Sequence, residues 1–264
     1  MIEIDILYPH EMRNEPMVDI MRKLLSLSLF ALLAGLAQAD ELKPARNGDF
    51  AHYTFALAWQ PGFCTAGGEG CLPSQPKEEL IGLHGLWPSE PKSLEDKGVK
   101  VQQWWASGCS MLPHVTAVPL LSEELRQRLK ETMPQLASDL QTHEYVKHVQ
   151  CFGYDANEFF STALQMREAV VDSDFGRYLL AQAGQTRSGA EVKDAFAKGY
   201  ATGERGALQL RCAKDGKGRN VLTELWFTLK KDKLDSFPEA DSFLDTPVAE
   251  REDTCSQPFL LPKW

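Results

Sequence analysis

The chain has 264 residues, of which 43% are hydrophobic and 25% charged, and this balance excludes a disordered or fibrous protein. Its 28 basic and 37 acidic residues give a net charge of −9, which argues against a protein that wraps nucleic acid through many phosphate contacts. Neither a linker composition nor a repeat of fixed period is present, so we expect a single domain.

The N-terminal region has the pattern of a secretory signal. Arg22 and Lys23 precede an apolar run that ends in Ala-Gln-Ala at positions 37–39. We interpret residues 21–39 as a signal peptide cleaved after Ala39, with a retained signal anchor as the alternative. Residues 1–20 are then an upstream extension without a role in the fold. A secreted or periplasmic protein with no stable membrane association is expected.

Six cysteines follow this signal, at positions 64, 71, 109, 151, 212 and 255. An even number of cysteines in an oxidising compartment argues for three disulfides, and the count alone leaves 15 possible connectivities. Since the chain contains no CxxC pair, the spacing does not favour a structural zinc site.

Strands are expected near both ends of the mature chain. The stretch HYTFALAW, residues 52–59, alternates apolar side chains with period two and is stopped by Pro61-Gly62. The apolar run LIGLHGLWP, residues 80–88, predicts a buried strand whose end carries His84. The stretches ALQLRC and NVLTELWFTLK flank the turn KDGKG and predict a hairpin.

Helices are expected between these strands. Ser122 is a candidate N-cap for a helix that ends before Pro134, and the stretch from 143 to 151 follows as a second helix. Asp155 caps the next helix, which has an apolar stripe. Two more helices are expected near residues 173–183 and 189–199, the latter capped by Ser188. The predicted fold is α+β, with a central, mostly antiparallel sheet packed by several helices.

The stretch HEYVKHVQC, residues 143–151, nearly matches the zinc-protease motif HExxH. On a helix, the side chains of His143, Glu144, Lys147 and His148 share an arc of about 140° opposite an apolar arc. Two zinc-binding histidines on one helix need a spacing of four, whereas His143 and His148 are five apart and diverge by about 140°. We therefore reject a metal site and expect no cofactor. A solvated helix surface is the alternative.

A second histidine motif favours a catalytic interpretation. LHGLWPS places His84 where an apolar strand meets a turn, so that its imidazole can point into a cleft, although a structural core histidine is the alternative. Phosphodiester transfer needs one neutral histidine as base and one protonated histidine as acid. Lys147 neutralises phosphoryl charge and Glu144 orients or tunes a histidine. If the nucleophile is the 2′-OH of the substrate, the reaction needs no metal and is restricted to RNA.

LHGLWPS and HEYVKHVQC resemble the two active-site signatures of the ribonuclease T(2) family. The stretches ALAWQPGFC, EPKSLEDKGVKVQQWWASGC and KHVQCFGYD are similar to its bacterial branch, periplasmic enzymes of the ribonuclease I type. The resemblance spans about residues 50–256. It implies an α+β fold and metal-independent cleavage of single-stranded RNA through a 2′,3′-cyclic phosphate, which is then hydrolysed to a 3′-phosphate.

The resemblance also implies residue roles. His84 and His148 match the acid–base pair, and we assign His148 as base and His84 as acid. Glu144 and Lys147 match the residues that stabilise the transition state. The positions that match substrate-binding residues are His143, for phosphate, and Trp87, for base stacking.

The disulfides implied by the resemblance are Cys109–Cys151 and Cys212–Cys255, which leaves Cys64–Cys71 as a local pair. The chain departs from the family pattern at Val149-Gln150, where relatives usually carry Gly-Thr or Gly-Ala. It also has Ser89 where some fungal members carry Asp, so no base preference is implied.

We therefore predict that residues 40–264 form the catalytic domain of a secreted or periplasmic, broad-specificity endoribonuclease. Its expected partner is single-stranded RNA and not DNA, and we expect a monomer. The alternative is a catalytically silent relative that binds RNA or a protein, and a metal-dependent phosphodiesterase is a weaker third hypothesis.

Overall fold

The computed structural model describes residues 42–264, except residues 69, 76, 78 and 134–139. The predicted signal peptide and upstream extension lie outside the described residues. Within the described part of the chain, no helix has both the length and the apolar character needed to cross a membrane.

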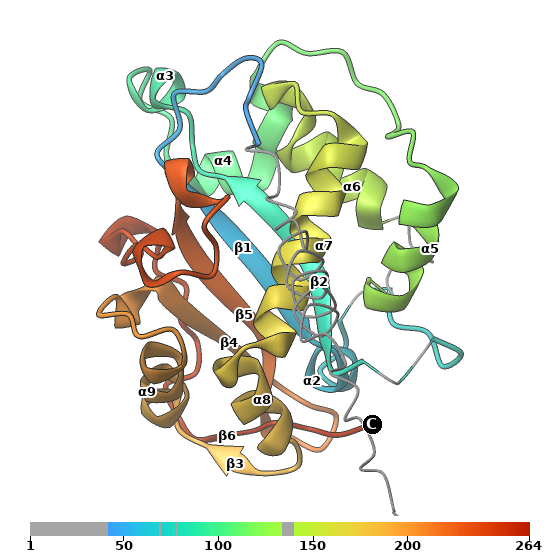
Figure 1. Cartoon of the computed structure of the whole chain (residues 1–264), viewed down its shortest axis with the longest axis vertical. Coiled ribbons are helices and arrows are strands. Elements are labelled where there is room, and N and C mark those ends of the chain that lie inside the picture. The colour runs from blue at the N-terminus through green and yellow to red at the C-terminus, as the bar shows by residue number, and fades with distance from the viewer. Residues whose placement is uncertain (1–41, 69, 76, 78, 134–139) are drawn as a thin grey trace, which may run out of the picture. The chain divides into compact units, whose positions relative to one another are not determined.

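A six-stranded sheet forms the centre of the domain (Figure 1). The strand order is β2-β1-β5-β6-β3, and β4 also pairs with β5. Every pairing between strands is antiparallel except that of β5 with β6. The strands are β1 His52–Trp59, β2 Ile81–Pro88, β3 Thr186–Arg187, β4 Leu208–Lys214, β5 Asn220–Lys230 and β6 Phe259–Leu260. The predicted α+β fold and its mostly antiparallel sheet are confirmed.

The helices begin and end largely where the sequence predicts. In the described residues they are α2 Gln60–Thr65, α3 Lys92–Glu95, α4 Val101–Ser107, α5 Glu123–Thr132, α6 Leu140–His148, α7 Ala156–Asp172, α8 Asp174–Ala181 and α9 Gly189–Gly199. The side chains of Ser122, Asp155 and Ser188 accept hydrogen bonds from backbone N–H groups at the starts of α5, α7 and α9, as predicted. Helices α2, α3 and α4 were not predicted, because four to seven residues are too few to show an apolar period.

Helix α6 ends three residues earlier than predicted. It ends at His148, and a 3₁₀ turn, Gln150–Phe152, continues the chain. The predicted helix through Cys151 was therefore too long by one turn. As a result, the candidate site residues 143–148 occupy the last turns of α6, next to the disulfide that follows.

One face of the sheet forms the core. The alternating side chains predicted for β1 are all fully buried, namely Tyr53, Phe55, Leu57 and Trp59. On the same face, Phe227 of β5 contacts Phe175 of α8 and Phe196 of α9, with ring centroids 6.3 and 5.9 Å apart. Helices cover this face. Because successive side chains of a strand point to opposite faces, the residues between the core side chains lie on the other face of the sheet.

Three disulfides stabilise the domain, and their pairing is confirmed. The pairs are Cys64–Cys71, Cys109–Cys151 and Cys212–Cys255, and no cysteine is free. The Cys109–Cys151 bond joins the 3₁₀ turn Gly108–Met111 to the segment after α6. Gly108 has a φ of 53°, and a Cβ there would overlap the carbonyl of Lys147. The turn therefore packs with its backbone directly against the end of α6.

Candidate active site

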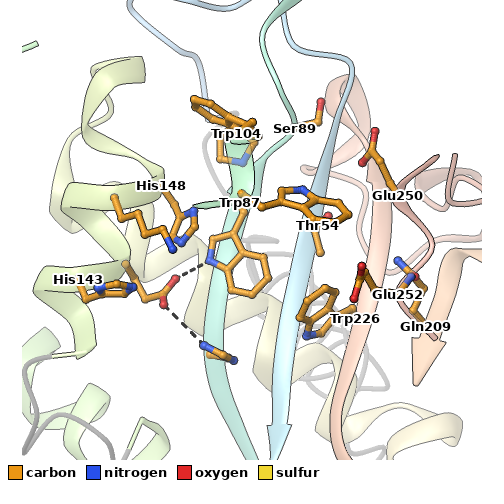
Figure 2. Close-up of a pocket in the computed structure, with 15 residues that line it drawn as sticks. Thr54, Trp87, Ser89, Trp104, His143, His148, Gln209, Trp226, Glu250 and Glu252 are labelled. Atoms are coloured by element: carbon orange, nitrogen blue, oxygen red, sulfur yellow. Dashed lines mark hydrogen bonds and ion pairs between the residues drawn. The ribbon is translucent and has the colours of Figure 1, made fainter. Parts of the chain in front are cut away.

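A single pocket of about 310 Å³ brings together every residue that the sequence placed in the site (Figure 2). These residues are His84, Trp87, His143, Glu144, Lys147 and His148. The pocket lies on the open face of the sheet and is bounded by β2, β1, β5 and α6. Its volume is at the lower end of the range for sites that hold small ligands.

A β-bulge positions His84. Gly85 pairs with Ala56 and Leu83 pairs with Leu57, so β2 has one more residue than β1 at this point, and that residue is His84. Strict alternation would place His84 and Trp87 on opposite faces of the sheet, and the extra residue brings both to the pocket face. The prediction that His84 lies where the strand meets a turn was wrong. It lies within β2, and a bulge rather than a strand end directs its imidazole into the pocket.

Glu224 of β5 holds the imidazole of His84. The Nδ1 atom of His84 is hydrogen-bonded to a carboxylate oxygen of Glu224, and its Nε2 atom lies 3.7 Å from Glu144. Burial by itself would lower the pKa of His84. The hydrogen bond and charge of Glu224, together with the charge of Glu144, outweigh burial and raise this pKa to about 8. His84 is therefore predominantly protonated at neutral pH.

Glu144 is a buried carboxylate, with 2% of its surface exposed. It accepts a hydrogen bond from the indole N–H of Trp87, drawn as a dashed line in Figure 2. Burial raises its pKa, although His84, the Trp87 N–H, His143 and Lys147 act in the opposite direction. Gly85 makes this contact possible, because a Cβ there would overlap both the indole nitrogen and the Glu144 carboxylate.

His148 is in the opposite electrostatic state from His84. Burial first, and then the charges of Lys147, His143 and His84, lower the pKa of His148 well below its ordinary value. The indole of Trp87 lies between the two imidazoles, with its ring centroid 5.3 Å from each. One pocket therefore holds two histidines that both contact Trp87 and whose pKa values are shifted in opposite directions.

Three of these residues form a group that has the geometry to hold a metal ion. His143, Glu144 and His148 each offer one ligand atom, and these atoms lie within 4.8 Å of one another. The ring centroids of the two histidines lie 6.1 Å apart, closer than their angular separation on the helix suggested. Lys147 lines the same pocket, and its cation opposes metal binding. Metal independence stays a prediction.

Comparison with known proteins identifies the family. The model of the Ribonuclease T2 family matches residues 50–239. The chain belongs to this family. It is 31% identical to Ribonuclease I of Escherichia coli (strain K12) over an alignment 264 positions long. The alignment covers 91% of this chain and 96% of that protein. A second relative, the intracellular ribonuclease LX of Solanum lycopersicum, is 22% identical over 82% of this chain and 85% of that protein. The predicted enzyme class, a ribonuclease, is confirmed.

Solved structures have the same fold. RNase NT in complex with 5′-AMP superposes with a TM-score of 0.56 at 18% identity, and the match covers 82% of this ribonuclease and 100% of that chain. Ribonuclease MC1 from the seeds of bitter gourd gives a TM-score of 0.51 at 18% identity, over 80% of this chain and 100% of that one. At these identities the likeness establishes the fold alone.

The ribonuclease has further pocket residues that sequence reasoning missed. Glu224 supports His84 from outside the pocket lining, and the pocket itself is lined by Trp226 of β5 and Gln209 of β4, which are direct partners in the hairpin. Trp226 packs edge-to-face on Trp87 at 5.3 Å, and the guanidinium of Arg211 lies 4.6 Å from the Trp226 ring. The stretch NVLTELWFTLK contained a sign of these residues. Glu224 and Trp226 are two residues apart, so a strand places their side chains on the same face.

Proposed function

We propose that this ribonuclease cleaves single-stranded RNA without a metal, by transfer of the phosphodiester to the 2′-OH and then hydrolysis of the 2′,3′-cyclic phosphate to a 3′-phosphate. The observation that carries the proposal is that His84 and His148 line one pocket, and their surroundings shift their pKa values in opposite directions. Transfer to an internal hydroxyl needs a neutral base and a protonated acid at the same pH, and the pocket provides both.

In the first step, neutral His148 removes the proton of the 2′-OH, and the 2′-oxygen attacks phosphorus. Protonated His84 gives its proton to the departing 5′-oxygen. Glu224 holds Nδ1 of His84, so Nε2 is the atom that faces the pocket and donates the proton. In the second step the roles reverse, and water takes the place of the 5′-oxygen. The pKa directions of the two histidines support this order.

The remaining site residues stabilise the charge that develops on phosphorus. Lys147 and His143 lie on the same arc of α6 as His148; Lys147 supplies positive charge to the phosphoryl oxygens, and the His143 imidazole offers them a hydrogen-bond donor. Glu144 lies beside His84 and accepts a hydrogen bond from Trp87, so its carboxylate orients these two side chains in the pocket. Trp87 fixes the Glu144 carboxyl through its N–H and offers an indole to a base at the pocket wall.

Three disulfides support the proposed secreted or periplasmic location, because such bonds persist in oxidising compartments. We propose cleavage after Ala39 and a monomeric mature protein. Mass spectrometry of the N-terminus of the exported protein tests the cleavage position, and a mature chain that begins elsewhere contradicts it.

The central experiment incubates the mature protein with single-stranded RNA and with DNA of the same sequence, in excess EDTA. We expect cleavage of the RNA only, with fragments that end in 2′,3′-cyclic phosphate at early times. Activity that requires added metal would support a metal-dependent phosphodiesterase instead. A protein that binds RNA and leaves it intact would be the catalytically silent relative.

The acid–base pair is tested by His84→Ala and His148→Ala. Each substitution should lower kcat of the first step by a factor of about 10²–10⁴, the usual contribution of a general acid or base. His52→Ala is a suitable comparison, because His52 is buried against Glu250 and does not line the pocket. Near-normal turnover of either pocket variant would refute the assignment.

A further inference from the structure

A second groove adjoins the catalytic pocket across α6. It is lined on one side by the loop residues Thr116, Ala117 and Val118 and on the other by α6. The α6 residues in its wall are Thr142, His143, Val146 and Lys147. Two of these, His143 and Lys147, also line the catalytic pocket. The two depressions therefore share a wall, and a chain that leaves one can enter the other.

The loop that forms the outer wall has no regular structure but is held at two points. The Gln150 amide accepts a hydrogen bond from the Ala117 N–H at 3.0 Å and donates one to the Ala117 carbonyl at 2.6 Å. The Asn157 amide pairs in the same way, accepting from the Ser122 N–H at 2.8 Å and donating to the Leu120 carbonyl at 3.0 Å. Each side-chain amide forms hydrogen bonds with loop backbone groups that a neighbouring strand would otherwise satisfy. These bonds fix the position of the loop.

Gln150 is nearly fully buried, with 6% of its surface exposed. A buried amide that satisfies both its donor and its acceptor on one backbone residue keeps the loop at a set distance from the end of α6. The loop nevertheless leaves apolar side chains in solvent, since Val115, Val118 and Leu120 are 79%, 65% and 85% exposed. Of the three, only Val118 lines the groove.

The charge of the groove fits a nucleic acid strand. Its described lining residues carry no carboxylate, although the whole chain has a net charge of −9, and its ionisable groups are His143 and Lys147. Val118 and Val146 line the same groove and add apolar surface to it. A flexible strand of RNA presents phosphates to cations and base faces to apolar side chains, and this groove offers both.

We infer that the groove between the 113–121 loop and α6 binds a nucleotide of the RNA strand beyond the two that are joined by the scissile phosphate. This inference rests on the proposed function. It assigns the loop a substrate-binding role and gives Gln150 a positioning role, since Gln150 acts through Ala117 and does not touch the substrate. The predicted consequence is that longer substrates are cleaved more efficiently than a dinucleotide.

The test compares kcat/KM for a single-stranded hexanucleotide with kcat/KM for a dinucleoside monophosphate. Val118→Glu should lower the hexanucleotide-to-dinucleotide ratio by about tenfold, because it places a negative charge beside a bound phosphate. Val118→Lys should raise the same ratio, and a higher salt concentration should reduce both effects. The matched controls are Val115→Glu and Leu120→Glu, which add the same charge to the same loop outside the groove.

The outcomes separate the two proposals. If the unsubstituted protein cleaves neither substrate, the proposed function fails. If it cleaves both, but Val118→Glu and Val118→Lys change the ratio in the same direction or no more than Val115→Glu does, the groove does not bind RNA and the inference is overturned. Opposite shifts at Val118, with none at Val115, support it.

Discussion

Glu224 offers the sharpest prediction, because it sets the charge of His84 without lining the pocket itself. The substitution Glu224→Gln keeps the size of the side chain and an oxygen that accepts a hydrogen bond from Nδ1, but it removes the negative charge. The pKa of His84 is raised from 6.5 to about 8 in the presence of Glu224, a stabilisation of the protonated form by about 2 kcal/mol. Since burial alone lowers this pKa, the variant should have a pKa of 6.5 or below.

The expected effect depends on pH. An acid catalyst is active while it holds its proton, so the alkaline limb of the kcat/KM profile follows the pKa of His84. At pH 8 about half of the His84 side chains are protonated in the unsubstituted protein and about 3% in the variant, which predicts a loss of at least about fifteenfold. At pH 5 both proteins are protonated, and their rates should be nearly equal.

The measurement is a pH profile of RNA cleavage for both proteins, together with Glu250→Gln as the control. Glu250 lines the same pocket, but it is paired with His52 and not with His84. If the alkaline limb of Glu224→Gln stays in place, or if Glu250→Gln moves it as far, the carboxylate of Glu224 does not control the proton of His84 and the reasoning is refuted.

Three further predictions follow from the fold. Gly85→Ala should lower kcat/KM by about 10²-fold with little change in melting temperature, since its methyl displaces Trp87 from its carboxylate partner; equal activity would contradict the geometry. Replacing Cys109 and Cys151 by serine removes the cross-link that closes a loop of 42 residues, and it should lower the free energy of unfolding by about 4 kcal/mol. Denaturant titrations measure this change, and an unchanged unfolding midpoint would contradict the prediction. Asp155→Ala should cost about 1 kcal/mol in the same titrations without altering kcat/KM, and a fall in kcat/KM would mean that this cap also supports the site.

The sequence predicted the elements that have local signals. Ser122, Asp155 and Ser188 are caps whose chemistry is contained within four residues, and each caps the helix expected of it. The strand 52–59 shows its buried face by simple alternation. The candidate site residues on α6 were identified because helical spacing places them on one arc and because this stretch, together with that around His84, resembles the signatures of a known family.

What the sequence did not predict depends on contacts between distant segments. Glu224 lies 140 residues from His84 and meets it only because β1 pairs with both β2 and β5. The bulge at His84 is a property of the pairing between two strands, and β2 by itself shows no sign of it. Gln150 appeared only as a departure from the family pattern, and its hydrogen bonds to Ala117 become visible once the loop is placed beside α6.

The bond between Cys109 and Cys151 links the end of α6 to the redox state of the compartment in which the chain folds. It lies three residues after His148, and its partner turn packs against Lys147, so this end of α6 gains its covalent anchor only after the two thiols are oxidised. Because disulfides persist in oxidising compartments, the rigidity of this helix end depends on where the chain folds.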